Sequence, residues 1–445
     1  MDDFRLIADR LAADINEGRL RPGDRLPPQR RFAREHRIAP STATRVYGEL
    51  VRRGLAVGEV GRGTFIRAAR PPADPALAEP ATAPIDLELN FPLLPEQADL
   101  LAKSLSGLVR VDAMGQSLRP TTPAGTPAVR EAAAAALARG GWTPEPERIL
   151  LAGNGRQAIA AAFSALAGIG ERIAVEALTY PVVKAIAARL GITLVPIEVD
   201  ADGMVPDAVR AAHRTSPLRA VYVQPAVQNP LGITMSAERR RALAEVLVEL
   251  DLPAIEDGVN GFLRDDLPPL LALAPEQVML VDSLSKRLAP GLSLGFLVPP
   301  TGFADRVAAA LRSGGWTALR FAMEVATRCL ADGTLAEIEA AKRRDARARQ
   351  ELRAECLAEF TVRADPGSYH CWWELPEQWR AETFVGAAAR RGIAVSPAAA
   401  FTVGAGHAPS AVRLALSGPP PEQLRAALDQ LAGLARGTAE DAGIE

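Results

Sequence analysis

Lysine is rare in this chain, and the few positions that carry it stand out. Of 51 basic residues only four are lysines: Lys103, Lys184, Lys286 and Lys342. The lysine amine can lose its proton and attack a carbonyl carbon to form an imine, whereas arginine stays protonated in proteins. Lys286 lies in the segment SLSKRLAPG, residues 283–291, shortly after the apolar run 279–281. Because arginine is the default cation of this chain, a lysine at this place favours amine chemistry over a plain surface charge.

A glycine turn supplies a second chemical feature. Gly155 and Arg156 follow the apolar run 149–152 and precede an alanine-rich helical pattern. The N-terminus of a helix binds phosphate because its backbone amides and its dipole both favour negative charge. The guanidinium of Arg156 can hold two oxygens of one phosphate. We therefore predict an anion site here, although a glycine turn alone is a weak signal. The alternative for Arg156 is a side chain that faces solvent or pairs with an acid.

Residues 40–54 carry side chains that suit contact with DNA. Pro40 is well placed as the first residue of a helix, and Gly54 as its end. The outward side chains in the first half of this helix are Ser41, Thr42, Thr44 and Arg45. Their hydroxyl and guanidinium groups can reach base edges and phosphates in a major groove. The opposite side is apolar and is predicted to face a small core: Ala43, Val46, Tyr47 and Leu50.

Two further elements complete an N-terminal module of α+β type. A short helix is predicted from 28 to 36, and Arg30 near its start can hold a phosphate together with the helix N-terminus. Residues 55–57 and 64–66 are predicted to be two short strands, joined by a loop that contains Gly-Arg-Gly. The small neighbours let Arg62 reach a DNA backbone or minor groove, and Gly63 belongs to the same loop tip.

Charge is distributed unevenly along the chain. Residues 1–67 hold fourteen Arg and nine Asp or Glu, about +5, which leaves about −7 for the rest of a chain whose net charge is −2. A basic small unit on an acidic large one indicates that one end binds a polyanion. An ordinary solvated surface is the alternative explanation of the charge alone.

Length and patterning predict more than one domain. A chain of 445 residues is too long for one ordinary core. We predict a DNA-binding module over 1–67, a Pro/Ala-rich linker over 68–84 and a large domain over 85–437. Alanine-rich helical segments alternate with apolar runs in the large domain, which predicts a mostly parallel sheet covered by helices. The predicted strands are 149–152, 172–175, 193–197, 220–223, 254–255, 279–281 and 295–298.

The composition of the chain indicates where in the cell the protein is expected. No apolar stretch is long enough to span a bilayer, and the acidic start Met1-Asp2-Asp3 does not match a secretory signal. Three cysteines and four histidines show neither a disulfide framework nor metal-ligand spacing. We therefore expect a cytoplasmic protein with no membrane partner and no metal site.

The N-terminal segment 26–67 resembles the winged helix-turn-helix of GntR-type regulators over its full length. The resemblance implies double-stranded operator DNA as a partner. It places the outward residues of the helix 40–54, together with Arg30, Arg62 and Gly63, at the DNA. A helical module that only docks other proteins is the alternative.

Residues from about 86 to 435 resemble fold-type-I aminotransferases, which depend on pyridoxal 5'-phosphate. The order of the two parts resembles the MocR subgroup of GntR-family transcription regulators. The resemblance implies an α/β domain with a small C-terminal α/β subdomain, and a homodimer. Within it, Lys286 corresponds to the lysine that forms the Schiff base, while Gly155, Arg156 and Ser283 correspond to residues around the cofactor phosphate.

The same resemblance assigns the remaining site residues. Tyr180 corresponds to the aromatic side chain that stacks on the pyridine ring. Asn229, in Asn-Pro-Leu-Gly, corresponds to the partner of the phenolic oxygen. Asp257 corresponds to the carboxylate that keeps the pyridine nitrogen protonated and makes the ring an electron sink. Arg413 corresponds to the arginine that clamps a substrate or effector carboxylate. For Tyr180 and Arg413 the alternatives are a core tyrosine and a surface arginine.

The chain departs from this family pattern at three positions. It has Ser293 where relatives carry a phosphate-binding arginine, Val259 where we align a tyrosine after the pyridine aspartate, and Pro120 where we align a second tyrosine. Such losses weaken cofactor binding by several kcal/mol unless something compensates, because charge-assisted bonds contribute about 1.5–3 kcal/mol each. Arg156 is the candidate for that compensation.

We therefore expect a DNA-binding transcriptional regulator whose large domain binds pyridoxal phosphate and senses an amino acid, an amine or the cofactor itself. One rival is an active aminotransferase with an appended DNA-binding domain, against which the missing arginine and tyrosine argue. The other is a repressor that has lost the cofactor and keeps the large domain only as a dimerisation scaffold.

Overall fold

The structure is a computed structural model, and its described part divides into two compact units. It describes residues 4, 7, 8, 10, 11, 14, 19, 20, 24–52, 55–59, 63–66, 83–264, 266–404 and 408–438. The units are Met1–Pro75 and Ala76–Glu445, and each is described here by itself. Most of the predicted linker, and also Gly54 and Arg62, lie outside the described residues.

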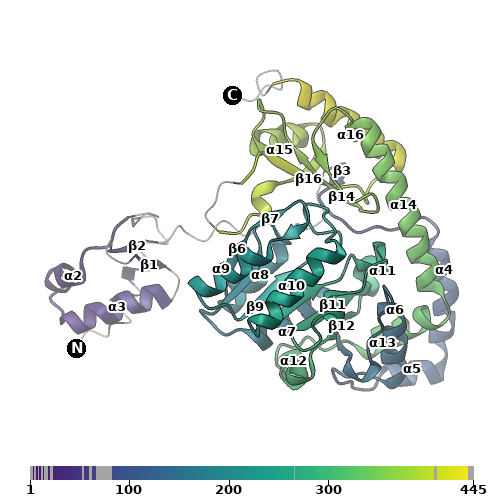
Figure 1. The fold of residues 1–445 in the computed structure, drawn as a ribbon, viewed down its shortest axis with the longest axis horizontal. Helices are drawn as coiled ribbons and strands as arrows, with labels where there is room; N and C mark the ends of the chain where they lie inside the picture. The colour runs from purple at the N-terminus through teal and green to yellow at the C-terminus, as the bar shows by residue number, and fades with distance from the viewer. Residues whose placement is uncertain are drawn as a thin grey trace. The chain divides into compact units, whose positions relative to one another are not determined.

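The first unit has a small helical core and a two-stranded sheet (Figure 1). Its elements in the described ranges are α2 (Gln29–Glu35), α3 (Pro40–Arg52), β1 (Ala56–Glu59) and β2 (Gly63–Ile66), and the two strands are antiparallel. Tyr47 donates a hydrogen bond from its hydroxyl to the carbonyl oxygen of Pro27 at 2.6 Å. The side chains predicted to face the core are all buried: Ala43, Val46, Tyr47 and Leu50. The helix that starts at Pro40 and the strand pair are confirmed, as expected for a winged helix-turn-helix.

A seven-stranded sheet forms the centre of the second unit. Its order is β4 (Leu150–Ala152), β12 (Gly295–Val298), β11 (Val278–Ser283), β10 (Ala254–Asp257), β9 (Ala220–Val223), β5 (Arg172–Glu176) and β6 (Thr193–Ile197). Strand β12 is antiparallel to both of its neighbours, and every other pair in this sheet is parallel. All seven predicted strands are present, and the prediction of a mostly parallel sheet is confirmed.

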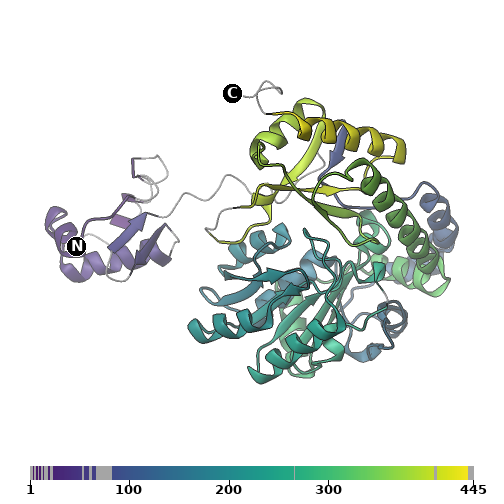
Figure 2. The ribbon, with the colours of Figure 1, turned by 45° about the horizontal axis from the view of Figure 1, so that its top comes forward.

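Helices bury both faces of this sheet (Figures 1 and 2). Successive strand residues point to opposite faces, so Ile173 and Val175 pack in one core cluster with Phe163, while Ala174 packs in the other with Val129. The first cluster includes residues of α7 (Gly155–Leu166), α8 (Pro181–Leu190) and α12 (Ala304–Ser313). The second includes residues of α6 (Pro127–Leu137), α9 (Pro206–Thr215), α10 (Ala237–Glu249) and α13 (Arg320–Ala331). Burial on both faces explains why the strands are continuous apolar runs.

A smaller five-stranded sheet completes the second unit. Its order is β13 (Val362–Arg363), β14 (His370–Glu374), β16 (Ala411–Ala415), β15 (Ile393–Pro397) and β3 (Ile85–Leu87). Strand β3, at the start of the unit, pairs in parallel with β15 near its end. Helices α15 (Ala381–Arg390) and α16 (Pro421–Arg436) pack on this sheet around Trp373 and Phe384. This small domain is the predicted C-terminal subdomain.

One long helix connects the two sheets. Helix α14 (Thr334–Cys356) packs against α4 (Gln97–Leu105) and α13 of the large domain, and against α16 of the small domain. Among the described residues no helix combines the length and apolarity needed to cross a membrane.

Candidate functional site

The carboxyl edge of the large sheet carries a cavity beside Lys286. Six residues singled out in the sequence line it: Gly155, Arg156, Tyr180, Asp257, Ser283 and Lys286. They come from the ends of strands β10 and β11, from the short helix α11 (Leu284–Arg287) after β11, and from the segments that follow β4 and β5. Ligands bind at this edge in open α/β sheets because the loops after neighbouring parallel strands meet there. Asn229 and Arg413, which the sequence also singled out, are not among the lining residues.

The N-terminus of α7 forms one end of the cavity. Asn154 caps this helix, since its Oδ1 accepts a hydrogen bond from the Gln157 amide at 3.0 Å. A Cβ on Gly155 would lie 2.9 Å from the Cβ of Ser283, so only glycine permits this approach. The amides at the start of α7 and the Ser283 hydroxyl therefore lie close together, in an arrangement suited to an anion.

Three serine hydroxyls meet at the same end. The Oγ of Ser285 lies 2.7 Å from that of Ser283 and 2.5 Å from that of Ser293. The Oγ atoms of Ser283 and Ser293 are 3.2 Å apart. Ser293, which the sequence analysis aligned with an arginine of the aminotransferase family, thus joins a hydroxyl cluster beside the cavity. Hydroxyls can donate to phosphate oxygens but add no positive charge, and Arg156 is the guanidinium that lines this cavity.

Asp257 is held at the base of the cavity by three donors. Its Oδ2 accepts from the Tyr222 hydroxyl at 2.6 Å and from Gln224 Nε2 at 3.0 Å, and its Oδ1 accepts from the Val259 amide at 3.1 Å. Burial raises the pKa of Asp257, and these hydrogen bonds lower it. The sequence analysis did not identify Tyr222 and Gln224 as residues of this site. The sequence features that could have identified them are a tyrosine inside the apolar strand β9 and a glutamine directly after that strand.

The amine of Lys286 lies in a low-dielectric position. Its Nζ donates to Asn260 Oδ1 at 3.3 Å. Burial is the main cause that lowers the pKa of Lys286 to about 8; the nearby charge of Asp257 raises it, and the charges of Arg413 and Arg156 lower it. The sequence analysis aligned Val259 with a tyrosine of the family. In the structure it is Asn260, the next residue, that accepts a hydrogen bond from Lys286.

Tyr180, Asn229 and Arg413 surround this core of the site. Burial raises the pKa of Tyr180, and the nearby charge of Arg156 lowers it. Asn229 is buried; its backbone amide donates to Gln224 Oε1 at 2.8 Å, and its Oδ1 has no hydrogen-bond partner. Asn229 is therefore connected to Asp257 through Gln224.

Arg413, on β16, is also buried. Its Nη2 donates to Ser396 Oγ at 2.9 Å and to the carbonyl oxygen of Glu88, while its Nε has no partner. Its guanidinium carbon lies 5.3 Å from the centre of the Phe401 ring. Burial lowers the pKa of Arg413 to about 10. A buried guanidinium with an unsatisfied donor is suited to a carboxylate ligand.

The first unit presents the predicted DNA-contacting residues from α2 and α3. Arg30, Ser41, Thr44 and Arg45 are exposed, and Thr42 is half-buried. The Thr44 hydroxyl donates to Gln29 Oε1 at 2.9 Å, which connects the start of α2 to the first turns of α3. Gly63 begins β2. Within the described ranges, no group of three or more His, Cys, Asp or Glu side chains is arranged to bind a metal ion.

Known families match both units. Residues 5–66 match the family described as bacterial regulatory proteins, gntR family, and residues 83–431 match aminotransferase class I and II. The fold and the site thus define a helix-turn-helix unit joined to an aminotransferase-type domain. The chain belongs to the MocR-type group of GntR-family transcriptional regulators, which are DNA-binding regulators with an aminotransferase-like domain.

Two regulators and one aminotransferase illustrate the similarity. The uncharacterized HTH-type transcriptional regulator YdeF of Bacillus subtilis is 30% identical over 94% of this chain and 90% of its own length. The vitamin B6 salvage pathway transcriptional repressor PtsJ of Salmonella typhimurium is 26% identical over 90% of this chain and 91% of its own. A crystal structure of an archaeal alanine:glyoxylate aminotransferase shares the fold of the large unit, with a TM-score of 0.73, 24% identity and coverage of 80% of this chain and 91% of that one.

Proposed function

We propose that the aminotransferase-like domain binds pyridoxal 5'-phosphate and senses a small molecule with an amino group, and that this changes how the protein holds operator DNA. The observation that carries the proposal is Lys286, a half-buried residue whose amine has a pKa lowered by desolvation to about 8, in a cavity shared with the α7 N-terminus and Asp257. Only an unprotonated amine attacks a carbonyl carbon, and the lowered pKa increases its fraction near neutral pH. When bound, the cofactor would supply a carbonyl carbon that reacts with amines and a ring that withdraws electrons.

The phosphate end of the cavity fits this cofactor. Because Gly155 carries no Cβ, Ser283 can lie against the start of α7, whose first amides would bind the phosphate. Ser283 and Ser285 would donate hydroxyl hydrogen bonds to it. Arg156 would supply the positive charge that Ser293 does not, so this chain would hold the phosphate from α7 instead of from the segment after Lys286.

The other end of the cavity fits the pyridine ring. Tyr222 and Gln224 fix the carboxylate of Asp257, which would hold the ring nitrogen protonated. Tyr180 would stack on the ring, and the side-chain amide of Asn229 would donate to the phenolic oxygen. Together these residues would set the orientation of the pyridine ring and the protonation of its nitrogen.

Arg413 would recognise the carboxylate of an amino-acid effector. Its Nε lacks a hydrogen bond, and its charge already acts on Lys286. PtsJ, a similar regulator, is named as a repressor of the vitamin B6 salvage pathway, which supports the cofactor itself as an alternative signal.

A homodimer would present two copies of the first unit to a repeated DNA half-site. In each copy Arg45 and the outward Ser41, Thr42 and Thr44 would read bases, and Arg30, Arg62 and Gly63 would contact the backbone. Sedimentation at micromolar concentration tests the dimer, and a monomeric chain would contradict this part of the proposal.

The cofactor proposal is tested by spectroscopy of the full-length protein. The wild-type chain should take up pyridoxal phosphate and gain visible absorbance, and its affinity for operator DNA should change when the cofactor or an amino acid is added. Lys286→Ala should stay folded but lose the visible absorbance, while Lys103→Ala, at an exposed lysine of α4, should behave as wild type.

Two results would favour the rival functions. If the wild-type chain takes up no cofactor, the large domain acts as a scaffold. If it steadily converts amino donors, the protein is an aminotransferase as well as a regulator.

A further inference from the structure

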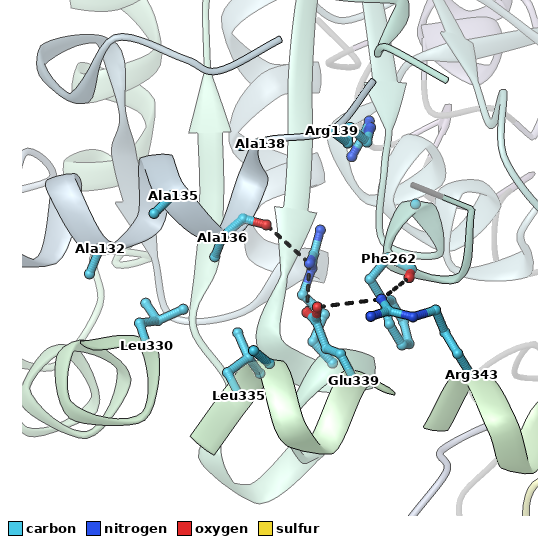
Figure 3. Close-up of a pocket in the computed structure, with 13 residues that line it drawn as sticks. Ala132, Ala135, Ala136, Ala138, Arg139, Phe262, Leu330, Leu335, Glu339 and Arg343 are labelled. Atoms are coloured by element: carbon cyan, nitrogen blue, oxygen red, sulfur yellow. Dashed lines mark hydrogen bonds and ion pairs between the residues drawn. The ribbon is translucent and has the colours of Figure 1, made fainter. Parts of the chain in front are cut away.

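Arg139 is a buried residue whose guanidinium lies behind the Lys286 site. It follows helix α6 in a tight turn, in which its backbone exchanges two hydrogen bonds with that of Trp142, both at 3.0 Å. It lines a second cavity, between α6, the start of α14 and the 3-10 turn Gly261–Leu263 (Figure 3). It is not among the residues that line the cavity at Lys286. Its contacts nevertheless reach three parts of that site.

The guanidinium of Arg139 bridges the carboxyl ends of two neighbouring strands. Its Nη2 donates to Glu256 Oε1 at 3.1 Å, and its Nη1 lies 3.6 Å from Asp282 Oδ2, in an ion pair without a hydrogen bond. Glu256 is on β10 and Asp282 is on β11, and both are buried. Successive residues of a strand point to opposite faces of the sheet, so Asp257 and Ser283, the next residues, face the other way and line the Lys286 cavity. Arg139 therefore connects the two strand ends that carry these site residues.

The same guanidinium packs against the turn that follows β10. A Cβ on Gly258 would lie 3.1 Å from Arg139 Nη2, and a Cβ on Gly261 would lie 2.7 Å from its Nη1, so both glycines leave room for the side chain. Between them is Asn260, which is buried and whose Oδ1 accepts from Lys286 Nζ at 3.3 Å. Arg139 thus supports, from behind, the turn that holds the hydrogen-bond partner of the Lys286 amine.

We propose that Arg139 is a positioning residue for the Lys286 amine. It acts through the carboxylates of Glu256 and Asp282 and through the turn 258–261, which together hold the groups around the amine in place. Arginine suits this role because its planar guanidinium can pair with two carboxylates at once, whereas the ammonium of a lysine is a single point charge. The role does not require a bound cofactor, since every contact that defines it lies within the chain.

The ionisation of Lys286 distinguishes this role from simple stabilisation of the fold. Burial is the main cause that lowers the pKa of Lys286 to about 8, while Asp257 raises it and Arg413 and Arg156 lower it. If the turn 258–261 loosens, water reaches the amine, and its pKa rises toward the ordinary value of 10.5. Loss of an ion pair that only stabilises the fold would leave this pKa unchanged in a folded variant.

Competitive acetylation of the full-length protein, prepared without pyridoxal phosphate, measures this pKa. The rate at which Lys286 is acetylated is followed against pH by mass spectrometry of its peptide, which is readily assigned because the chain has only four lysines. Only the unprotonated amine reacts, so the midpoint of the pH profile is the pKa of Lys286.

The decisive variant is the double change Arg139→Met with Glu256→Gln. It removes one positive and one negative charge, so a shift of the midpoint is not an effect of net charge. The glutamine still offers an oxygen to the Leu271 amide, from which Glu256 accepts at 3.0 Å, and Asp282 stays paired with Arg287. The midpoint should rise by about one pH unit as the amine becomes hydrated.

Two further variants complete the test. Arg139→Lys keeps the positive charge but not the bridge, so its midpoint should also rise; as the milder change it serves as the test if the double variant does not fold. Arg148→Met is the matched control, because Arg148 is a half-buried arginine of the same domain that donates to the carbonyl oxygen of Pro299 at 3.0 Å and lines neither cavity. It should leave the midpoint unchanged. Circular dichroism establishes that each variant is folded.

Two outcomes overturn the role of Arg139. One is a wild-type midpoint in the folded double variant or in folded Arg139→Lys. The other is a shift in Arg148→Met as large as in those variants. Because the acetylated protein carries no cofactor, either outcome leaves the pyridoxal phosphate proposal standing, and a chain that takes up no cofactor leaves this role intact.

Discussion

Lys342 holds Lys286 through the main chain: its Nζ donates to the carbonyl oxygen of Lys286 at 2.8 Å and to that of Leu288 at 2.7 Å. Lys342 is fully buried on α14, the helix that connects the two sheets. The hydroxyl of Tyr369, beside the small sheet, donates to the carbonyl oxygen of Lys342 at 2.8 Å. A series of hydrogen bonds therefore connects Tyr369, beside the small-domain sheet, through Lys342 to Lys286.

The first prediction concerns the stability that this contact provides. At alkaline pH, where Lys342 is neutral in the folded and the unfolded chain, Lys342→Met should lower the free energy of unfolding by about 1–3 kcal/mol, because the buried carbonyl of Lys286 loses its donor. The Leu288 carbonyl keeps a donor in Gln97 Nε2, at 2.8 Å. Urea denaturation measures the difference. Lys103→Met, at an exposed lysine, is the control and should have no measurable effect.

The second prediction concerns the pH dependence of the same contact. Burial lowers the pKa of Lys342 from 10.5 to about 7. Between these two values the unfolded chain binds more protons at this residue than the folded chain does, so stability rises with pH. The free energy of unfolding of wild type, relative to Lys342→Met, should increase from pH 7 upward and level off above pH 10.5. A difference that stays flat across this window would show that Lys342 does not titrate differently in the two states.

The third prediction concerns the phosphate end of the Lys286 cavity. Arg156→Gln should weaken pyridoxal phosphate binding by about 10-fold to 100-fold, the range expected for one charge-assisted hydrogen bond. The double variant with Ser293→Arg should recover most of that affinity. Equilibrium binding followed by absorbance gives the affinities, and Arg189→Gln, at an exposed arginine of α8, is the control. Equal binding by wild type and Arg156→Gln would mean that another group holds the phosphate.

The fourth prediction concerns DNA. Arg62→Ala should weaken binding to all duplex sequences to a similar degree and should lower the slope of log affinity against log salt by about one unit, as expected for one phosphate contact. Fluorescence anisotropy with labelled duplexes at several salt concentrations measures this slope. Arg391→Ala, at an exposed arginine of the second unit, should leave it unchanged. If Arg62→Ala also leaves it unchanged, the loop tip does not contact DNA.

Much of the fold could be predicted because local sequence patterns identify its helices and strands. The apolar runs that became β9 and β12 are short, buried on both faces and separated by helical segments, and these features identify strands in a parallel sheet. Strand β3 could not be predicted. It is only three residues long and pairs with a strand about 300 residues later in the chain, as the register Ile85 to Ile393 shows.

The site was predictable only where the residue type itself carries chemistry. Lys286 was found because lysine can act as an imine-forming amine and arginine cannot. Asp257 was assigned only through the resemblance to fold-type-I aminotransferases. Asn260 and Gln224 were missed, since an amide gains its role from a neighbour that only the folded chain supplies.

Strand β3 lies in the small-domain sheet and is the first described strand of the second unit. The polypeptide that leaves the DNA-binding unit is therefore anchored to the small domain before it reaches the large one. Arg413, on β16 of the same sheet, donates to the carbonyl oxygen of Glu88, the residue after β3. A rotation of the small-domain sheet would therefore carry the first described residues of the second unit with it.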